Sequence, residues 1–245
     1  RMQVERPGMV KPHRPTWLES QLEGARIQNV ERRGKNILLH FSGGKLLHVH
    51  LRMTGNLYVI PDVRFRVLTA RIWFELEGGK GLIFDDPRTL GRMRLYRGQE
   101  IGGLLDGLGV EPLSAGFTKE WLIDVASRSR KPAKIFLMDQ QHIAGLGNIY
   151  AAEALYRAAI DPRKPISSVR KPKLAALHQA IVDVLTEGVQ SAVKAYEKPG
   201  VFNEAEEFPC DVYDREGEPC NRCGRSIKRI PQGGRSTYFC GGCQR

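Results

Sequence analysis

The sequence Cys220-Asn221-Arg222-Cys223, followed by Cys240-Gly241-Gly242-Cys243, has the spacing C-x2-C-x16-C-x2-C at the C-terminal end of the chain. Two residues between paired cysteines let a tight turn aim both sulfurs at one ion, and four thiolates suit a tetrahedral Zn²⁺. The residues between the pairs have the length of a β-hairpin and include Gly233-Gly234. The spacing therefore predicts a zinc ribbon in which one structural zinc ion is bound by Cys220, Cys223, Cys240 and Cys243.

The alternatives for these four cysteines are two disulfide bonds or a set of reactive thiols. We favour zinc, because an intracellular protein keeps its thiols reduced. The fifth cysteine, Cys210, has no partner at a comparable spacing, and we expect it to be a packed thiol.

Basic side chains surround the predicted metal site. Arg225, Lys228, Arg229 and Arg235 lie between the two cysteine pairs, and the whole chain has 38 Lys and Arg against 27 Asp and Glu. The resulting formal charge of +11 is typical of proteins that bind polyanions. Many soluble proteins carry such charge only as a solvated surface, but charge and zinc ribbon together indicate nucleic acid as the partner.

The chain has 245 residues, of which 41% are hydrophobic, and this is enough for two domains and a small zinc module. No apolar run approaches the ~20 residues that are needed to span a bilayer, and no signal peptide opens the sequence. We therefore expect a soluble monomer without membrane contact, located in the cytoplasm and associated with the nucleoid if the source is bacterial.

The pattern of apolar residues changes near residue 100. Before it, short apolar runs separated by glycine-rich turns predict strands over 36–41, 46–51, 57–60, 72–76, 82–84 and 93–96. Residues 1–97 are therefore predicted to form an antiparallel β-sandwich or barrel.

Later in the chain, apolar residues recur at intervals of three and four. They predict helices over 118–127, 133–140, 148–159 and 172–195. The expected fold class is α+β and multidomain: a β-sandwich, a linker over 98–112, a helical domain over 113–209 and the zinc module over 210–245.

The segment Gly145-Leu146-Gly147-Asn148 precedes one of these predicted helices. Asn148 is suited to cap the helix, and a glycine-rich helix N-terminus offers free N–H groups to an anion such as phosphate. The alternative is a capped helix after a tight turn, which the tetrapeptide by itself favours.

Six short segments occur in an order that resembles the formamidopyrimidine-DNA glycosylase family, whose relatives include endonuclease VIII. The resemblance runs from about residue 25 to the C-terminus. It implies that a β-sandwich, a helix–two-turns–helix domain and a zinc finger clamp duplex DNA around an oxidised base. The segments are Arg32-Arg33-Gly34-Lys35, residues 50–55 (HLRMTG), Asp86-Pro87-Arg88, residues 137–140 (LMDQ), residues 145–150 (GLGNIY) and residues 234–244 (GRSTYFCGGCQ).

The resemblance assigns roles to two groups of residues in the first domain. Lys35 matches a lysine beside the reaction centre, where a cation contacts the DNA backbone and assists proton transfer. Met53, Arg88 and Leu90 match three side chains that fill the gap left by the extruded nucleotide. The family commonly has Phe at the third position, so Leu90 departs from its pattern. The alternatives are a solvated charge for Lys35, a core residue for Met53 and a surface charge for Arg88.

In the second half of the chain, Lys134, Asn148 and Arg235 resemble the family's residues that hold the phosphates flanking the lesion. Phosphate contacts of this kind fix position and do not read sequence. The loop over 190–208, where the family covers its flipped base, is too divergent for a binding residue to be named.

Family members begin with a proline whose secondary amine attacks the sugar C1′, expels the base and forms a Schiff base before strand cleavage. This chain begins Arg1-Met2-Gln3, so the segment with the nucleophile and the first helix is missing from the sequence. Either the sequence is truncated or the protein has lost its catalytic start. We favour truncation, because Lys35, Arg88, Asn148 and Arg235 all remain.

The sequence therefore predicts a DNA glycosylase with AP-lyase activity that removes oxidised bases from damaged duplex DNA in base excision repair. The alternative is a non-catalytic protein that binds damaged DNA and lacks the nucleophilic proline. A third possibility, an RNA-binding ribbon protein, is disfavoured by Asp86-Pro87-Arg88 and by the Gly-Leu-Gly-Asn segment.

Overall fold

The computed structural model describes residues 1–65, 67–196 and 208–245. Its internal contacts divide the chain into two compact units, Arg1–Asp106 and Gly107–Arg245. Among the described residues, no helix combines the length and the apolar character that a membrane crossing requires.

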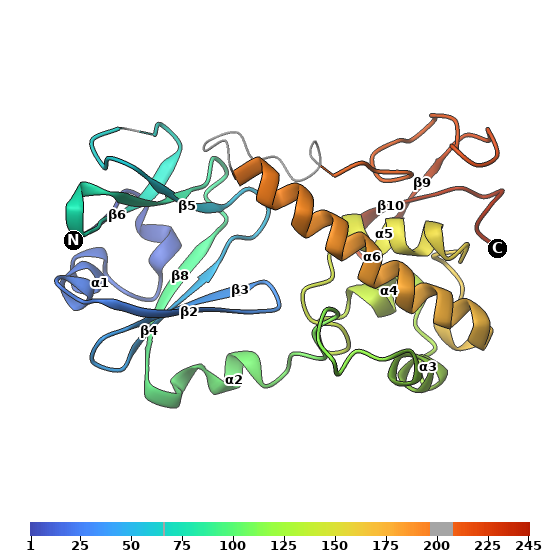
Figure 1. The fold of residues 1–245 in the computed structure, drawn as a ribbon, viewed down its shortest axis with the longest axis horizontal. Coiled ribbons are helices and arrows are strands. Elements are labelled where there is room, and N and C mark those ends of the chain that lie inside the picture. Colours follow the sequence, from blue (N-terminus) through green and yellow to red (C-terminus); the bar gives the residue numbers. More distant parts are fainter. Residues whose placement is uncertain (66, 197–207) are drawn as a thin grey trace. The chain divides into compact units, whose positions relative to one another are not determined.

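Unit 1 is a sandwich of two antiparallel sheets (Figure 1). One sheet has the strand order β1-β6-β7-β5 and the other the order β2-β3-β4-β8. The predicted β-sandwich is thus confirmed. The strands are β1 (Met2–Val4), β2 (Ile27–Arg33), β3 (Asn36–Phe41), β4 (Lys45–His50), β5 (Asn56–Ile60), β6 (Ala70–Glu75), β7 (Gly81–Asp85) and β8 (Arg92–Arg97).

Alternation along the strands places one set of side chains between the sheets. Leu39 of β3 and Leu47 of β4 are directly paired and meet Ile72 and Phe84 from the opposite sheet in one apolar cluster. Leu47, Ile72 and Phe84 are fully buried. Burial of such side chains stabilises the sandwich by roughly 1.5–3 kcal/mol each.

The sequence pattern did not predict the elements before residue 36. The strand β2 is exposed on both faces for most of its length, so it has no period-two signal. The helix α1 (Pro15–Leu22) buries only Leu18 and Leu22 and follows a 3₁₀ turn, η1 (Pro7–Val10). The predicted linker contains two further short elements, η3 (Gly98–Ile101) and α2 (Gly102–Leu105).

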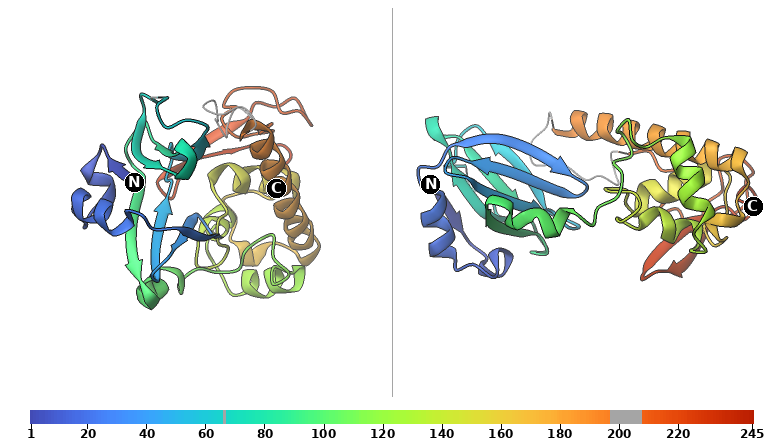
Figure 2. Two further views of the ribbon diagram at one scale, coloured as in Figure 1. Left: turned by 60° about the vertical axis from the view of Figure 1, so that its left-hand side comes forward. Right: turned by 90° about the horizontal axis from the view of Figure 1, so that it is seen from below.

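Unit 2 contains the predicted helices, with small shifts at their ends. They are α3 (Lys119–Ser127), α4 (Ala133–Met138), α5 (Asn148–Arg157) and α6 (Lys171–Tyr196), with a 3₁₀ turn η4 (Ile166–Ser168) between the last two. The long helix α6 runs beside α3 and α5 (Figure 2). The apolar faces of these three helices and of α4 share one core, in which Phe136, Leu155 and Ile181 are fully buried.

The C-terminal module is a β-hairpin of β9 (Lys228–Gln232) and β10 (Arg235–Phe239). Gly233 and Gly234 form its turn with φ values of 58° and 73°, a left-handed backbone that two-residue hairpin turns require. The predicted boundary at residues 209 and 210 stays a prediction, and most of the predicted base-covering loop over 190–208 lies outside the described residues.

Candidate metal centre and nucleic-acid interface

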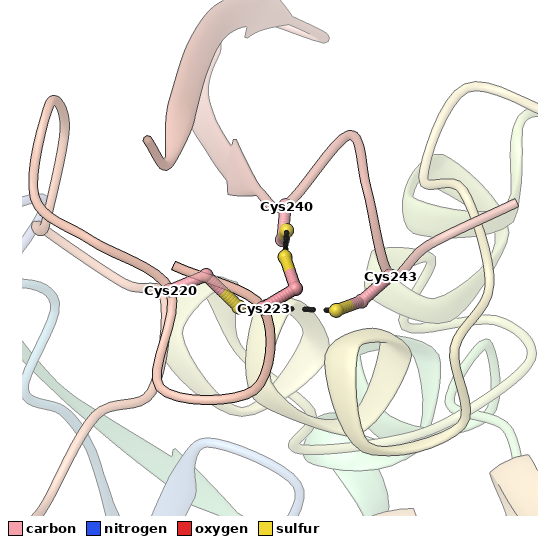
Figure 3. A group of neighbouring side chains, drawn as sticks. All are labelled: Cys220, Cys223, Cys240 and Cys243. Carbon is pink, nitrogen blue, oxygen red and sulfur yellow. Dashed lines mark hydrogen bonds between the residues drawn. The ribbon is translucent and has the colours of Figure 1, made fainter. Parts of the chain in front are cut away.

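Four cysteine sulfurs converge at the base of the C-terminal hairpin (Figure 3). Cys220 and Cys223 come from the turn before β9, and Cys240 and Cys243 from the turn after β10. All four Sγ atoms lie within 4.8 Å of one another. A tetrahedral zinc ion with thiolate ligands needs Sγ–Sγ separations of about 3.8 Å. Separations of 3.4 Å for Cys223–Cys240 and 3.9 Å for Cys220–Cys243 fit this requirement.

The same distances exclude the alternative of two disulfide bonds, since a disulfide places its sulfurs about 2.05 Å apart. The donor set fits a structural zinc ion, because four thiolates leave no coordination position for water or substrate. Cys210 lies outside this cluster, packs against the core of unit 2, and has a thiol pKa raised by burial to about 12. It is a packed thiol, as predicted.

The helix α5 supports the metal centre from outside the ribbon. The Oη atom of Tyr156 lies 3.3 Å from Cys220 Sγ, within hydrogen-bonding distance. The guanidinium of Arg222 stacks 4.2 Å from the centre of the Tyr156 ring and donates to the Tyr156 carbonyl oxygen at 2.9 Å. Outer contacts of this kind orient metal ligands. The sequence did not indicate Tyr156, because it lies 64 positions before Cys220 in the chain.

The structure places Lys134 in the interior of unit 2, and its predicted contact with phosphate stays a prediction. Its side chain is fully buried, and Nζ donates to Ser236 O and to Thr237 Oγ1, both at 2.7 Å. Burial, assisted by the positive charge of Arg235, lowers the pKa of Lys134 to about 7. In this position the amine holds the β10 strand through Ser236 and Thr237.

Asn148 does not cap α5, so that prediction is wrong. It is the first residue of the helix, and Gly147 occupies the N-cap position without a side-chain hydrogen bond. The Nδ2 atom of Asn148 instead donates to Ser236 O at 3.2 Å, the carbonyl that Lys134 also contacts. Arg235, which directly precedes Ser236 in the chain, is exposed at the start of β10. The structure therefore brings the three predicted phosphate residues together around one backbone group.

The predicted gap-filling residues lie on two loops of unit 1. Met53 follows β4, and Arg88 and Leu90 lie between β7 and β8. Met53 is 73% exposed, which excludes the alternative that it belongs to the core. The Nη1 atom of Arg88 lies 3.8 Å from Met53 Sδ, so the two loops meet at their tips.

Lys35 is exposed in the turn between β2 and β3, at the end of the sheet where Asn36 pairs with His50. Burial, followed by the charges of Arg52 and Lys35, lowers the pKa of His50 to about 4. Arg52 directly precedes Met53 in the chain. Lys35 thus shares one region of unit 1 with the two loops.

Three family models match the chain. They are the formamidopyrimidine-DNA glycosylase N-terminal domain over residues 1–93, the formamidopyrimidine-DNA glycosylase H2TH domain over residues 108–197, and a zinc finger found in FPG and IleRS over residues 217–245. The match to the first model corrects the expectation that the similarity starts near residue 25. Residues 1–24 carry it as well, although none of the six motifs lies there.

Curated relatives match over nearly the whole chain. Formamidopyrimidine-DNA glycosylase from Desulforamulus reducens is 38% identical over 247 residues, which cover 98% of this chain and 89% of the relative. The protein of the same name from Pelotomaculum thermopropionicum is 38% identical and is covered to 90% by the whole of this chain.

Solved structures give the same result. A Lactococcus lactis Fpg in complex with DNA that contains an abasic site matches with a TM-score of 0.86 at 28% identity. The complex of the L. lactis protein with FAPY-dG containing DNA matches with a TM-score of 0.85, also at 28% identity. Both matches cover 100% of this chain and 91% of the other. With three family models matched in order and relatives this similar, the chain belongs to the formamidopyrimidine-DNA glycosylase family.

Proposed function

We propose that this chain is a DNA glycosylase of base excision repair that removes oxidised bases from duplex DNA, with an associated AP-lyase activity. The observation that carries the proposal is the exposed pair of loops with Met53 and Arg88 at their tips. An enzyme that acts on a base within a duplex must flip it out, and the lost stacking has to be replaced. An apolar side chain beside an arginine can fill the gap and hydrogen-bond the base opposite.

The phosphate contacts are proposed for unit 2. Arg235 is the exposed cation, and the α5 N-terminus beside it offers backbone N–H groups to a second oxygen. Lys134 and Asn148 hold Ser236, so they determine where Arg235 stands. We therefore revise the role of Lys134 from a phosphate contact to a brace for the residue that makes it.

The proposed chemistry needs an amine nucleophile. In the family resemblance this is an N-terminal proline, whose nitrogen bonds to C1′ while the C1′–base bond breaks and the base leaves with a proton. The C1′–O4′ bond of the resulting adduct then breaks as O4′ takes a proton, which opens the sugar ring and leaves an iminium at C1′. This iminium makes the C2′ proton acidic, and removal of that proton expels the 3′ phosphate by β-elimination. Lys35 is proposed as the cation beside this centre, and Arg1 is not proposed as a nucleophile.

The proposed partner is double-stranded damaged DNA, bound by a monomer. The zinc ion is structural and takes no part in the reaction, because Cys220, Cys223, Cys240 and Cys243 complete its coordination. When bound, it supplies the cross-link around which the hairpin folds.

Borohydride trapping tests the enzyme proposal. The 245-residue chain and a form extended by the family's Pro-Glu start and first helix are each incubated with a duplex containing an abasic site. We expect a covalent complex only with the extended form, while both forms bind the duplex. Lys35→Ala in the extended form should slow excision more than it weakens binding, since it acts in the transition state.

Failure of the extended form to trap DNA that it binds tightly would favour the non-catalytic alternative. Efficient trapping by the chain that begins at Arg1 would show that a different amine, such as Lys35, is the nucleophile.

A further inference from the structure

One buried carboxylate, that of Asp86, joins the loop that carries Met53 to the loop that carries Arg88 and Leu90. Asp86, which directly follows β7, is fully buried. Its Oδ1 atom accepts a hydrogen bond from Thr54 Oγ1 at 2.5 Å, and its Oδ2 atom accepts one from the backbone N–H of Gly91 at 2.7 Å. Thr54 directly follows Met53, and Gly91 directly follows Leu90. Both oxygens of one side chain thus hold the neighbours of the proposed gap-filling residues.

The two loops also rest on the same aromatic ring. A Cβ atom at Gly55 would lie 2.8 Å from Cε2 of Phe84, and one at Gly91 would lie 2.3 Å from Cζ of the same ring. Phe84 is fully buried in the core of the sandwich. Only glycine allows both loops to approach the Phe84 ring this closely. The ring therefore limits how near each loop lies to the core, and the Asp86 carboxylate sets the distance between the two loops.

The backbone of both loops is held in an unusual conformation. Arg52, before Met53, has φ of 62°, and Thr89, between Arg88 and Leu90, has φ of 55°. Non-glycine residues adopt the left-handed region mainly where their surroundings determine it, and such residues cluster at functional sites. Here the surroundings include Arg92, whose Nη1 donates to the carbonyl oxygens of Thr89, Leu90 and Gly91 at 3.3, 3.0 and 2.8 Å.

We propose that Asp86 is a positioning residue that presets Met53, Arg88 and Leu90 as one rigid wedge for insertion into damaged duplex. The inference rests on the proposed function, because it assumes that these three side chains fill the gap left by the flipped nucleotide. Two independent loops would have to be ordered at the moment of insertion. A carboxylate that already holds both loops removes this entropic loss from the binding step. Hydrogen bonds to an ionised acceptor are strong enough for this task.

A purely structural role for Asp86 makes a different prediction. The loss of a buried hydrogen bond would then lower stability and weaken all DNA binding alike. A wedge, in contrast, acts only where a nucleotide has left the stack. The ratio of the dissociation constant for undamaged duplex to that for abasic duplex therefore separates the two roles.

Thr54 provides the sharpest variants, because it lies at the edge of the buried group. Thr54→Val removes the hydroxyl at nearly constant volume, and Thr54→Ser restores it. Asp86→Asn alters the carboxylate itself. Glu75→Gln, an exposed carboxylate on β6 of the same unit, is the matched control. Arg88→Ala serves as the reference for loss of the wedge itself.

Fluorescence anisotropy of the 245-residue variants would measure both dissociation constants at a temperature well below each melting point. We expect Thr54→Val and Asp86→Asn to lower the ratio about tenfold, the effect of one hydrogen bond to a charged group, with binding to undamaged duplex nearly unchanged. Thr54→Ser and Glu75→Gln should keep the wild-type ratio. A 2-aminopurine opposite the abasic site should report slower or weaker insertion for Thr54→Val and Asp86→Asn, as for Arg88→Ala, and wild-type insertion for Thr54→Ser and Glu75→Gln.

The outcomes separate the inference from the proposed function. If Arg88→Ala lowers the ratio but Thr54→Val does not, the wedge stands and the role of Asp86 is overturned. Equal weakening of both duplexes by Thr54→Val would also overturn it in favour of a structural role. If the wild-type chain does not distinguish the duplexes and Arg88→Ala changes neither constant, the proposed function fails and the inference falls with it. If Asp86→Asn does not fold, Thr54→Val and Thr54→Ser decide whether Asp86 has a positioning role or a purely structural one.

Discussion

At the scale of single residues, Lys134 and Arg235 are two cations of one region with different environments. Lys134 is fully buried against Ser236 and Thr237, whereas Arg235 is exposed at the start of β10. Only a cation that replaces counterions at a phosphate changes the salt dependence of DNA binding. The two residues should therefore be distinguishable by titration with salt.

Arg235→Ala should weaken binding to any duplex and reduce the slope of log affinity against log salt concentration by about 0.9, the value for one lost phosphate contact. Lys134→Met should weaken binding by a smaller factor than Arg235→Ala does. It should leave the slope of log affinity against log salt concentration unchanged, because it displaces Arg235 without removing a phosphate contact. Dissociation constants between low and moderate salt concentrations measure both effects. A reduced slope for Lys134→Met would return this lysine to the phosphate contacts.

Lys134 also predicts a pH dependence of stability. Below about pH 7 the amine is protonated in both states, and burial of the charge destabilises the folded state. Above its folded pKa of about 7, the folded chain releases this proton, while the unfolded chain keeps it up to the ordinary lysine pKa of 10.5. The unfolded state then binds more protons, so this residue makes stability rise with pH across that window.

Urea unfolding of wild type and Lys134→Met between pH 6 and 10, with zinc present, measures this effect. The free energy of unfolding of the wild type should rise relative to that of the variant as the pH increases. Neutral Nζ keeps two N–H groups for its two acceptors, so the hydrogen bonds survive deprotonation. A constant difference between the two proteins over this range would show that Lys134 has an ordinary pKa.

At the scale of elements, the zinc ribbon is held from two sides. The ion joins the four cysteines, and α5 supplies Tyr156 beside Cys220 within a small buried apolar cluster. Tyr156→Phe keeps the ring under Arg222 and removes the hydroxyl, so zinc affinity should fall roughly tenfold. Competition with a chromophoric chelator measures this loss.

Tyr238→Phe is the matched control, because it removes a hydrogen bond to Asp214 in the same module without touching a metal ligand. Unchanged zinc affinity in both variants would mean that the Tyr156 hydroxyl only fills space. Cys240→Ser, which removes a ligand outright, should disorder the ribbon, release the zinc and weaken DNA binding. Metal-free protein prepared without a chelator would contradict the assignment of the ribbon.

At the scale of the whole molecule, the net charge of +11 and the wedge contribute to binding in different ways. The charge attracts every duplex and is screened by salt. The wedge stacks in a gap that only a damaged or flipped site offers. Affinity for abasic and undamaged duplexes should therefore fall in parallel as salt increases, while their ratio stays nearly constant. A ratio that declines steeply with salt would mean that discrimination is electrostatic.

The sequence by itself determined the features that local spacing encodes. Four cysteines at fixed intervals predicted the zinc site, and alternating or helical apolar patterns predicted most strands and the main helices of unit 2. The order of the six short segments indicated the formamidopyrimidine-DNA glycosylase family. The strand β2 and the helix α1 were not predicted, because few of their side chains are buried and the periodic pattern of apolar residues is too weak.

Contacts between residues far apart in the chain were decided only by the tertiary structure. Lys134 meets Ser236 across 102 positions, and Thr54 meets Asp86 across 32. The sequence suggested that Asn148 Oδ1 accepts a hydrogen bond from a helix N–H as a cap, but in the structure Asn148 Nδ2 donates to Ser236 O of β10. The residue type limits which hydrogen bonds a side chain can make. Which partner is buried beside it depends on how whole elements pack, because burial makes an unpaired polar group costly and selects the arrangement in which it is paired.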